Sequence, residues 1–317
     1  MQRVSGLPHI KFLQETWEVS SHCRKGNIDI GLFYDGFGLL TFCYAYGIIT
    51  VEKRGGSMTT KQMLFEQLDS MKIPKNTVIH MHSSLKAIGE FEGNAEGLLD
   101  ALAEYITAEG GLFTVPTHTW ANIGKTEITL DMTTDFSCVG AFTRVAASHK
   151  DAHRSMHPTH SMAVFGDAVK AEDFIKCEKA TETTSGKDGC YGKLYTMGGK
   201  VLLVGVGHER NTYLHAVEEM LGVNRLSKGK MPFKVRKKDG TVIDRPIYSY
   251  VGAVSKYFPK FEPAFRYFGC ITDGFIGNAP AQLCDCRGML EVIKLLYEKS
   301  GTDLLCDDKP ICEKLYK

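Results

Sequence analysis

The sequence predicts an α/β protein with a mixed, largely parallel sheet flanked by helices. From residue 58 onward, apolar strand-like runs alternate with amphipathic helical stretches. Residues 76–82 are expected to form a strand, 95–111 a helix closed by glycine, and 112–119 another strand, which together make a β-α-β unit. Ligand sites in such folds lie where strands end and helices begin, so those junctions are the first place to look for function.

Further elements follow in order. A capped amphipathic helix is expected to begin at Thr59 or Thr60, because a threonine here precedes a helically spaced apolar pattern. Residues 161–170 and 200–207 are strand candidates, and the second is followed by a helix over residues 212–221.

Composition excludes several classes of protein. The chain has 317 residues, of which 43% are hydrophobic and 24% charged, and its net charge is +1. No global electric field would therefore recruit nucleic acid or an anionic membrane. Its ten cysteines include no CxxC pair, which indicates reduced thiols in a cytoplasmic protein. Cys284 and Cys286 lack further ligands nearby in the sequence, so no metal site is expected.

The first 57 residues differ from the remainder. The apolar run 36–51 is shorter than the ~18–20 residues of a membrane span, and no signal-peptide cleavage site follows it. Residues 53–56, Lys-Arg-Gly-Gly, are what a purine-rich ribosome-binding sequence would encode, so Met58 is the expected start and residues 1–57 an upstream translation. The alternative is a genuine extension packed on a single domain formed by residues 58–317.

The turn after the first strand of the β-α-β unit contains His82, Ser83, Ser84, Leu85 and Lys86. Two hydroxyls, backbone N–H groups and a lysine at the carboxyl end of a strand suit a phosphate or pyrophosphate. The structural alternative is that Ser83 or Ser84 only caps the next helix.

Two polar clusters adjoin later strands. Pro158 holds His157 in an extended or turn conformation, and Ser161 follows on the next strand. In the second cluster, Thr212, His215 and Glu218 are spaced at i, i+3 and i+6 on a helix, so Glu218 can hold or polarise His215.

Five blocks in this order resemble the aminoglycoside 3-N-acetyltransferases, also called the antibiotic N-acetyltransferase family, and its YokD-like members. The blocks are residues 80–89, 110–119, 154–166, 192–219 and 276–293, within a resemblance that covers roughly residues 60–295. The resemblance implies the fold of that family, which is unrelated to the GNAT fold, and acetyl transfer from acetyl-CoA to a primary amine without a metal. It also places the turn at residues 82–85 against the coenzyme, and His157 and Glu218 at the reacting centre. Where family members commonly read Gly-Ser-Pro, this chain has Gly189-Cys190-Tyr191, which changes the expected substrate contacts.

The chemistry of the residues agrees with this resemblance. An attacking amine must lose a proton, which a histidine with a pKa near 6.5 can accept, and His157 is the predicted base. Glu218 would orient the imidazole or hold the substrate ammonium, and Thr212 or Ser161 would donate a hydrogen bond to the developing oxyanion or the departing sulfur. His215 is assigned to the substrate site.

Charge patterning adds two expectations. Glu127, Asp131 and Asp135 form an acidic loop that could seat the ammonium groups of an aminoglycoside. Residues 225–245 carry eight basic and two acidic side chains, and they either face the phosphates of the coenzyme or form a solvated hairpin around the sequence Lys-Lys-Asp-Gly.

The leading hypothesis is thus an acetyl-CoA-dependent transferase that acts on the 3-amino group of an aminoglycoside or on a related amino-sugar metabolite. Small-molecule partners and a possible homodimer are expected, with neither nucleic acid nor membrane. Two rivals stay open: a non-catalytic protein that binds coenzyme A or a nucleotide, and a hydrolase of thioesters or amides.

Overall fold

The computed structural model describes residues 32–34, 39–44, 47–52 and 58–312, apart from residues 135, 224 and 253. The chain divides into two compact units, Met1–Ser57 and Met58–Lys317. In the first unit, strands β1 (Leu32–Tyr34), β2 (Leu39–Tyr44) and β3 (Gly47–Glu52) form an antiparallel sheet in that order. The apolar run 36–51 thus contributes to strands β2 and β3. That residues 1–57 are an upstream translation stays a prediction.

The second unit is built on a seven-stranded sheet. In spatial order its strands are β12 (Ile271–Ile276), β13 (Ala279–Asp285), β9 (Lys200–Val204), β4 (Val78–Ser83), β5 (Leu112–Pro116), β8 (Met162–Phe165) and β7 (His153–Arg154).

The predicted mixed α/β class is confirmed, but parallel pairing is less extensive than expected. Within this sheet, as far as the structure describes it, only the three central strands, β9, β4 and β5, pair in parallel, and the pairings toward both edges are antiparallel. Apolar runs show where strands lie but not their direction. At one edge the two-residue turn between β12 and β13 forces a hairpin, because a parallel pair needs a much longer connection.

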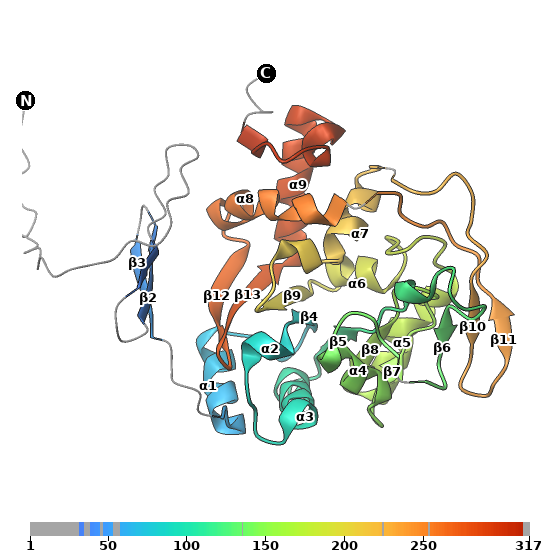
Figure 1. Ribbon diagram of the computed structural model, residues 1–317, viewed down its shortest axis with the longest axis horizontal. Coiled ribbons are helices and arrows are strands. Elements are labelled where there is room, and N and C mark those ends of the chain that lie inside the picture. Colours follow the sequence, from blue (N-terminus) through green and yellow to red (C-terminus); the bar gives the residue numbers. More distant parts are fainter. Residues whose placement is uncertain are drawn as a thin grey trace, which may run out of the picture. The chain divides into compact units, whose positions relative to one another are not determined.

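Helices cover both faces of this sheet (Figure 1). One face packs α1 (Lys61–Ser70), α3 (Asn94–Thr107) and α4 (Ala141–Ser148), and the other packs α5 (Ala168–Ile175), α6 (Cys190–Thr196), α7 (Tyr213–Met220), α8 (Glu262–Tyr267) and α9 (Cys286–Ser300). Successive side chains on a strand contribute to opposite cores, as Leu202 and Leu203 of β9 show. Short helical turns complete the unit: α2 (Leu85–Ile88), η1 (Trp120–Asn122), η2 (Lys176–Lys179), η3 (His208–Arg210), η4 (Val254–Phe261) and η5 (Thr302–Leu305).

Local signals in the sequence located most of these elements. The side chain of Thr60 accepts a hydrogen bond from the Met63 N–H and begins α1, as expected of an N-cap. Helices α3 and α7 and strands β4, β5 and β9 also lie where they were predicted, although α3 ends at Thr107 with Ala108, not glycine, as its C-cap. The stretch 161–170 is not one strand. Strand β8 ends at Phe165, and Asp167 then caps α5 by accepting a hydrogen bond from the Lys170 N–H.

A smaller sheet lies beside the main one, in the order β11 (Val242–Asp244), β10 (Lys234–Arg236) and β6 (Leu130–Asp131). Strands β10 and β11 form an antiparallel hairpin around residues 237–240, so the basic stretch is a hairpin. Strand β6 pairs in parallel with β10, which brings the acidic loop against the basic hairpin. Among the described residues, no helix combines the length and apolarity that a membrane span requires.

Candidate functional site

Six histidines lie toward the end of the main sheet where the central strands β4, β5 and β9 have their carboxyl ends. His80 and His82 lie on β4, His118 follows β5, and His157 and His160 precede β8, which is antiparallel to β5 and so begins at the same edge. The ring centroids of His80 and His82 are 4.7 Å apart, and those of His118 and His160 are 4.3 Å apart. His215 lies on α7, which follows β9, and it is counted with this histidine cluster because its charge contributes to lowering the pKa of His118 and His160.

Burial keeps most of these rings neutral. It is the main cause that lowers the pKa of His80, His118 and His160 well below the ordinary value of 6.5, and neighbouring histidines add to it. The pKa of His82 falls to about 3 for the same reason, with a further contribution from Arg210. These four rings are therefore neutral donors and acceptors at physiological pH.

His157, the predicted base, has both ring nitrogens bonded to the backbone. Its Nδ1 accepts hydrogen bonds from the N–H groups of Thr159 (3.2 Å) and His160 (2.9 Å), so the proton lies on Nε2, which donates to the carbonyl of Thr183 at 2.9 Å. The side chain is buried, and burial lowers its pKa. The ring shapes the 157–160 turn and ties it to residue 183, and neither nitrogen offers a free lone pair.

His215 has the opposite arrangement. Its Nδ1 lies 3.2 Å from Oε2 of Glu218, the residue three positions along α7, and Glu218 accepts a second bond at Oε1 from the Arg225 Nε at 2.9 Å. The carboxylate holds the proton on Nδ1, which leaves the lone pair on Nε2. The structure gives Nε2 no hydrogen bond within the described part of the chain, and the side chain is 14% exposed. Glu218 thus orients His215 rather than His157.

Aromatic packing fixes the plane of the His215 ring. Tyr250 stacks on it with ring centroids 4.4 Å apart, and Phe258 meets it edge-on at 4.7 Å. The Tyr250 hydroxyl donates to Oε1 of Glu219 at 2.5 Å, so the stacking partner is itself held in place. The open nitrogen of His215 is therefore presented in one direction.

Tyr191 lies between the segment that follows β5 and the start of α7. Its hydroxyl lies 2.7 Å from Nε2 of His118, and the side chain of Thr212 is close enough to influence the pKa of the phenol. Burial raises the pKa of this phenol, so it stays protonated. Thr212, predicted to contact the reacting groups, lies beside the cluster.

The β4–α2 turn supports both interpretations drawn from its sequence. Ser84 caps α2 by accepting from the Ala87 N–H, as the structural alternative requires. Yet Nε2 of His82 and the hydroxyl of Ser83 are buried without a hydrogen-bond partner among the described residues. Leu85 begins α2 and Lys86 is exposed. These two unpaired polar atoms fit a polar ligand at this turn.

Gly205 brings the end of β9 close to that turn. It has a positive φ of 62°, and a Cβ added there would lie 2.5 Å from the Cβ of Ala87. The Ser84 N–H also donates to the carbonyl of Val204 at 2.9 Å. The absence of a side chain at residue 205 lets α2 approach β9.

Ser161, predicted as a donor to the reacting centre, uses its hydroxyl for a hydrogen bond next to the sheet. It is fully buried, and its hydroxyl donates to the carbonyl of Thr117 at 2.8 Å. The backbone also pairs here, since the Thr117 N–H donates to the Ser161 carbonyl at 2.7 Å. This hydroxyl therefore holds the β5–β8 junction.

The acidic loop is paired with the basic hairpin. Glu127 accepts from the Nζ of Lys234 at 2.6 Å, and Asp131 accepts from an Nη of Arg236 at 3.0 Å. An ammonium group of a substrate would have to compete with both cations. Asp135, the third predicted carboxylate, lies outside the described residues.

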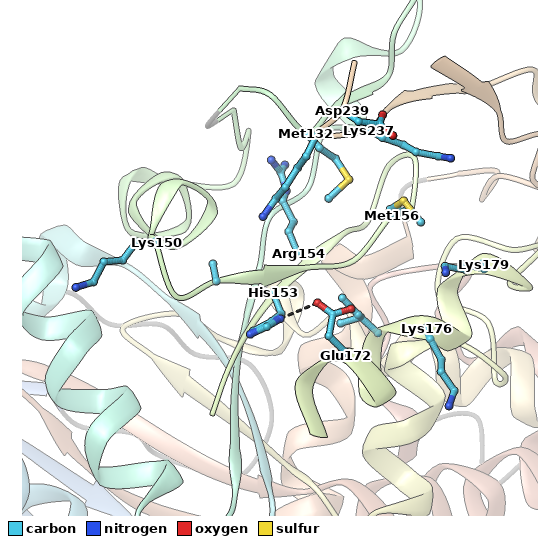
Figure 2. Close-up of a pocket in the computed structure, with 13 residues that line it drawn as sticks. Met132, Lys150, His153, Arg154, Met156, Glu172, Lys176, Lys179, Lys237 and Asp239 are labelled. Atoms are coloured by element: carbon cyan, nitrogen blue, oxygen red, sulfur yellow. Dashed lines mark hydrogen bonds and ion pairs between the residues drawn. The ribbon is translucent and has the colours of Figure 1, made fainter. Parts of the chain in front are cut away.

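A cavity of about 510 Å³, lined by none of the histidines of the cluster, lies between β7, α5 and the β10–β11 turn (Figure 2). Its charged lining is mostly basic; it consists of Lys150, His153, Arg154, Lys176, Lys179, Lys237 and Lys238 with Glu172 and Asp239. Figure 2 shows Lys150 and Lys176 extending away from each other. The cations do not converge on one point, so the cavity does not form a focused anion site.

Sequence reasoning missed several members of the site. His118 lay at the end of a predicted central strand, where the rule for α/β sheets could have found it. Tyr191 was noted only as a changed substrate contact, and neither its bond to His118 nor that of Tyr250 to Glu219 carried a local signal, because both contacts join distant segments. Cys284 and Cys286 are buried in the core, and the described part of the chain shows no three-ligand group around them.

Comparisons with known proteins identify a family and a shared fold. A family model described as aminoglycoside 3-N-acetyltransferase matches residues 81–298. The chain is 25% identical over 198 residues to the SPbeta prophage-derived aminoglycoside N(3')-acetyltransferase-like protein YokD of Bacillus subtilis (strain 168), across 56% of this chain and 72% of that protein.

Two solved structures show the shared fold. Aminoglycoside acetyltransferase AAC(3)-IVa in complex with a gentamicin superposes with a TM-score of 0.66 at 21% identity, across 77% of this chain and 90% of the other. AAC-IIIb, as a binary complex with CoASH, superposes with a TM-score of 0.61 at 18% identity, across 77% and 97%.

Proposed function

Because the chain belongs to the aminoglycoside 3-N-acetyltransferase family, we propose that it transfers an acetyl group from acetyl-CoA to a primary amine with His215 as the general base. The observation that carries this proposal is the His215–Glu218 pair, in which a carboxylate fixes one ring nitrogen and leaves the other open. His157 was the base expected from sequence, and its two backbone-bonded nitrogens favour a positioning role instead.

The β4–α2 turn is the proposed site of the acetyl donor. The unpaired His82 Nε2 and Ser83 hydroxyl would bind polar groups of acetyl-CoA there, beside the first N–H groups of α2. The relative that binds CoASH supports this choice of donor. When bound, acetyl-CoA supplies an activated acetyl carbonyl and a thiol leaving group.

The residues of the chain then handle the proton. As the amine nitrogen bonds to the acetyl carbon, Nε2 of His215 takes a proton from that nitrogen, and Glu218 stabilises the imidazolium that results. The C–S bond breaks, and the same proton can pass from Nε2 to the departing sulfur. Tyr191 and Thr212, which lie beside the cluster, are candidates to orient the reacting groups.

The proposed acceptor is the 3-amino group of an aminoglycoside or a related amino-sugar metabolite. The relative solved with a gentamicin supports this class. The basic cavity of Figure 2 has the wrong charge for a polycation, so we place the acceptor at the histidine cluster. Antibiotic resistance, a cytoplasmic location and a homodimer belong to the same proposal.

A thiol-release assay tests the proposal. The protein is incubated with acetyl-CoA and a panel of amines while free thiol and acetylated products are measured. Thiol release that depends on an amine, with a matching acetylated product, supports transfer. Release without amine would indicate hydrolysis, and binding of acetyl-CoA without release would indicate a non-catalytic binding protein; either result contradicts the proposal.

A further inference from the structure

Two cysteines and a glutamate lie together beneath the histidine cluster. Cys177 and Glu178 are on η2, and Cys190 is the first residue of α6. The two sulfur atoms are 3.9 Å apart, and the three ligand atoms all lie within 4.8 Å of one another. Cys190 and Glu178 are buried and Cys177 is half-buried, so bulk solvent does not solvate this group.

The carboxylate of Glu178 is incompletely paired. Its Oε1 accepts from the Cys190 N–H at 2.7 Å, whereas Oε2 is buried without a hydrogen-bond partner in the described part of the chain. The nearby Arg245 donates to the backbone carbonyls of residues 178, 179 and 181 rather than to this carboxylate. An unpaired buried carboxylate oxygen is costly, and a carboxylate oxygen of Glu178 lies within 4.8 Å of two soft sulfur ligands.

We propose that Cys177, Cys190 and Glu178 form a zinc-binding site. A tetrahedral zinc ion with Zn–S distances of about 2.3 Å separates two thiolate sulfurs by about 3.8 Å, close to the distance between these two atoms. A carboxylate oxygen of Glu178 supplies a third ligand and water the fourth. Binding of Zn²⁺ releases the two thiol protons and leaves the site with one net negative charge, which Arg245 offsets.

The site would act as a structural clamp. It joins η2 to the start of α6, and the residue after Cys190 is Tyr191, whose hydroxyl contacts His118. Zinc would thus fix the position of Tyr191 against the histidine cluster while taking no part in acyl chemistry. This inference does not depend on the proposed acetyl transfer.

Metal binding to the full chain tests the proposal. The protein is purified under reducing conditions, its zinc content is measured, and the zinc-free protein is titrated with Co²⁺, which shows a thiolate-to-cobalt charge-transfer band when bound by cysteine. We expect one zinc per chain and that band for the wild type. Cys177→Ser and Glu178→Gln should each weaken zinc affinity by at least about 10-fold.

Cys138→Ser is the matched control, because Cys138 is a half-buried thiol elsewhere in the unit, and it should leave affinity unchanged. Cys177 is only half-buried and Glu178→Gln is isosteric, so both variants should fold. No zinc and no charge-transfer band in the wild type would overturn the proposal. Equal losses in the control, or a Cys177–Cys190 disulfide in the reduced preparation, would overturn it too.

Discussion

The 157–160 turn and helix α7 both carry a histidine beside a strand, yet the two rings are used in opposite ways. Both ring nitrogens of His157 form hydrogen bonds with the backbone, so neither is available to a substrate. In His215, Nδ1 is hydrogen-bonded to the carboxylate of Glu218, and Nε2 has no hydrogen-bond partner among the described residues. The availability of a nitrogen lone pair, rather than the presence of a histidine in a suggestive motif, separates a candidate base from a structural residue.

Replacing His215 is the strongest way to test this comparison. His215→Ala should lower kcat by about 10²–10⁴-fold, the usual contribution of a general base, while the protein stays folded. The measurement is amine-dependent thiol release, with folding checked by circular dichroism. His153→Ala is the matched control: this histidine also pairs with a glutamate, Glu172, at 2.7 Å, but outside the cluster. Similar rates for His215→Ala and the wild type would remove His215 from the mechanism.

A double variant tests whether Glu218 acts through His215. Glu218→Gln should lower kcat because it no longer stabilises the imidazolium, and the pH profile of kcat/KM should shift. If Glu218 is a positioning residue, Glu218→Gln in the His215→Ala background should cost almost nothing further, since groups that act as a unit are not additive. Multiplicative losses would instead give Glu218 an independent role, such as holding the acceptor ammonium.

His157→Ala should affect stability more than catalysis. It leaves two backbone N–H groups and the Thr183 carbonyl unpaired in a buried turn, so the free energy of unfolding should fall by about 1–3 kcal/mol. Denaturant unfolding measures this loss, and kcat of the folded enzyme should change by less than about 10-fold. A loss of kcat of about 10²–10⁴-fold without destabilisation would restore His157 as the base.

Acid should destabilise the folded protein through its buried histidines. Burial lowers the pKa of His82 to about 3 and that of His208 to about 4, whereas an unfolded chain protonates histidine near 6.5. Below pH 6.5 the unfolded state therefore binds more protons than the folded state. The stability present above that pH is lost as the pH falls, and the free energy of unfolding drops by up to about 1.4 kcal/mol per pH unit for each such ring. Unfolding measured between pH 7 and 5 should show this loss, and His208→Asn should reduce its slope. An equal slope in that variant would argue against a neutral native His208.

The smallest effect is expected at the acidic loop. Glu127 is paired with Lys234, so Glu127→Gln should change KM for an aminoglycoside by less than about twofold, the scale of an exposed ion pair. Steady-state kinetics with an active amine checks this. A large rise in KM would instead support the loop as a seat for substrate ammonium groups.

The sequence located strands, helices and their caps well because these depend on nearby residues. The N-cap Thr60, helix α3 and strand β4 were all identified from local pattern. Strand direction at the sheet edges was not, since it depends on which strand lies beside which. Similarly, the i, i+3 spacing predicted contact between His215 and Glu218, while the spacing around His157 gave no sign that Thr183 would bond to its ring.

The sequence by itself determined the α/β class, the position of the β4–α2 turn and the carboxylate partner of His215, because each follows from contacts within a few residues along the chain. Only the tertiary structure decided which histidine keeps an open nitrogen and which carboxylates are neutralised. The physical reason is that hydrogen bonds and ion pairs across long sequence separations, such as His157 to Thr183 and Glu127 to Lys234, leave no local pattern in the residues that make them.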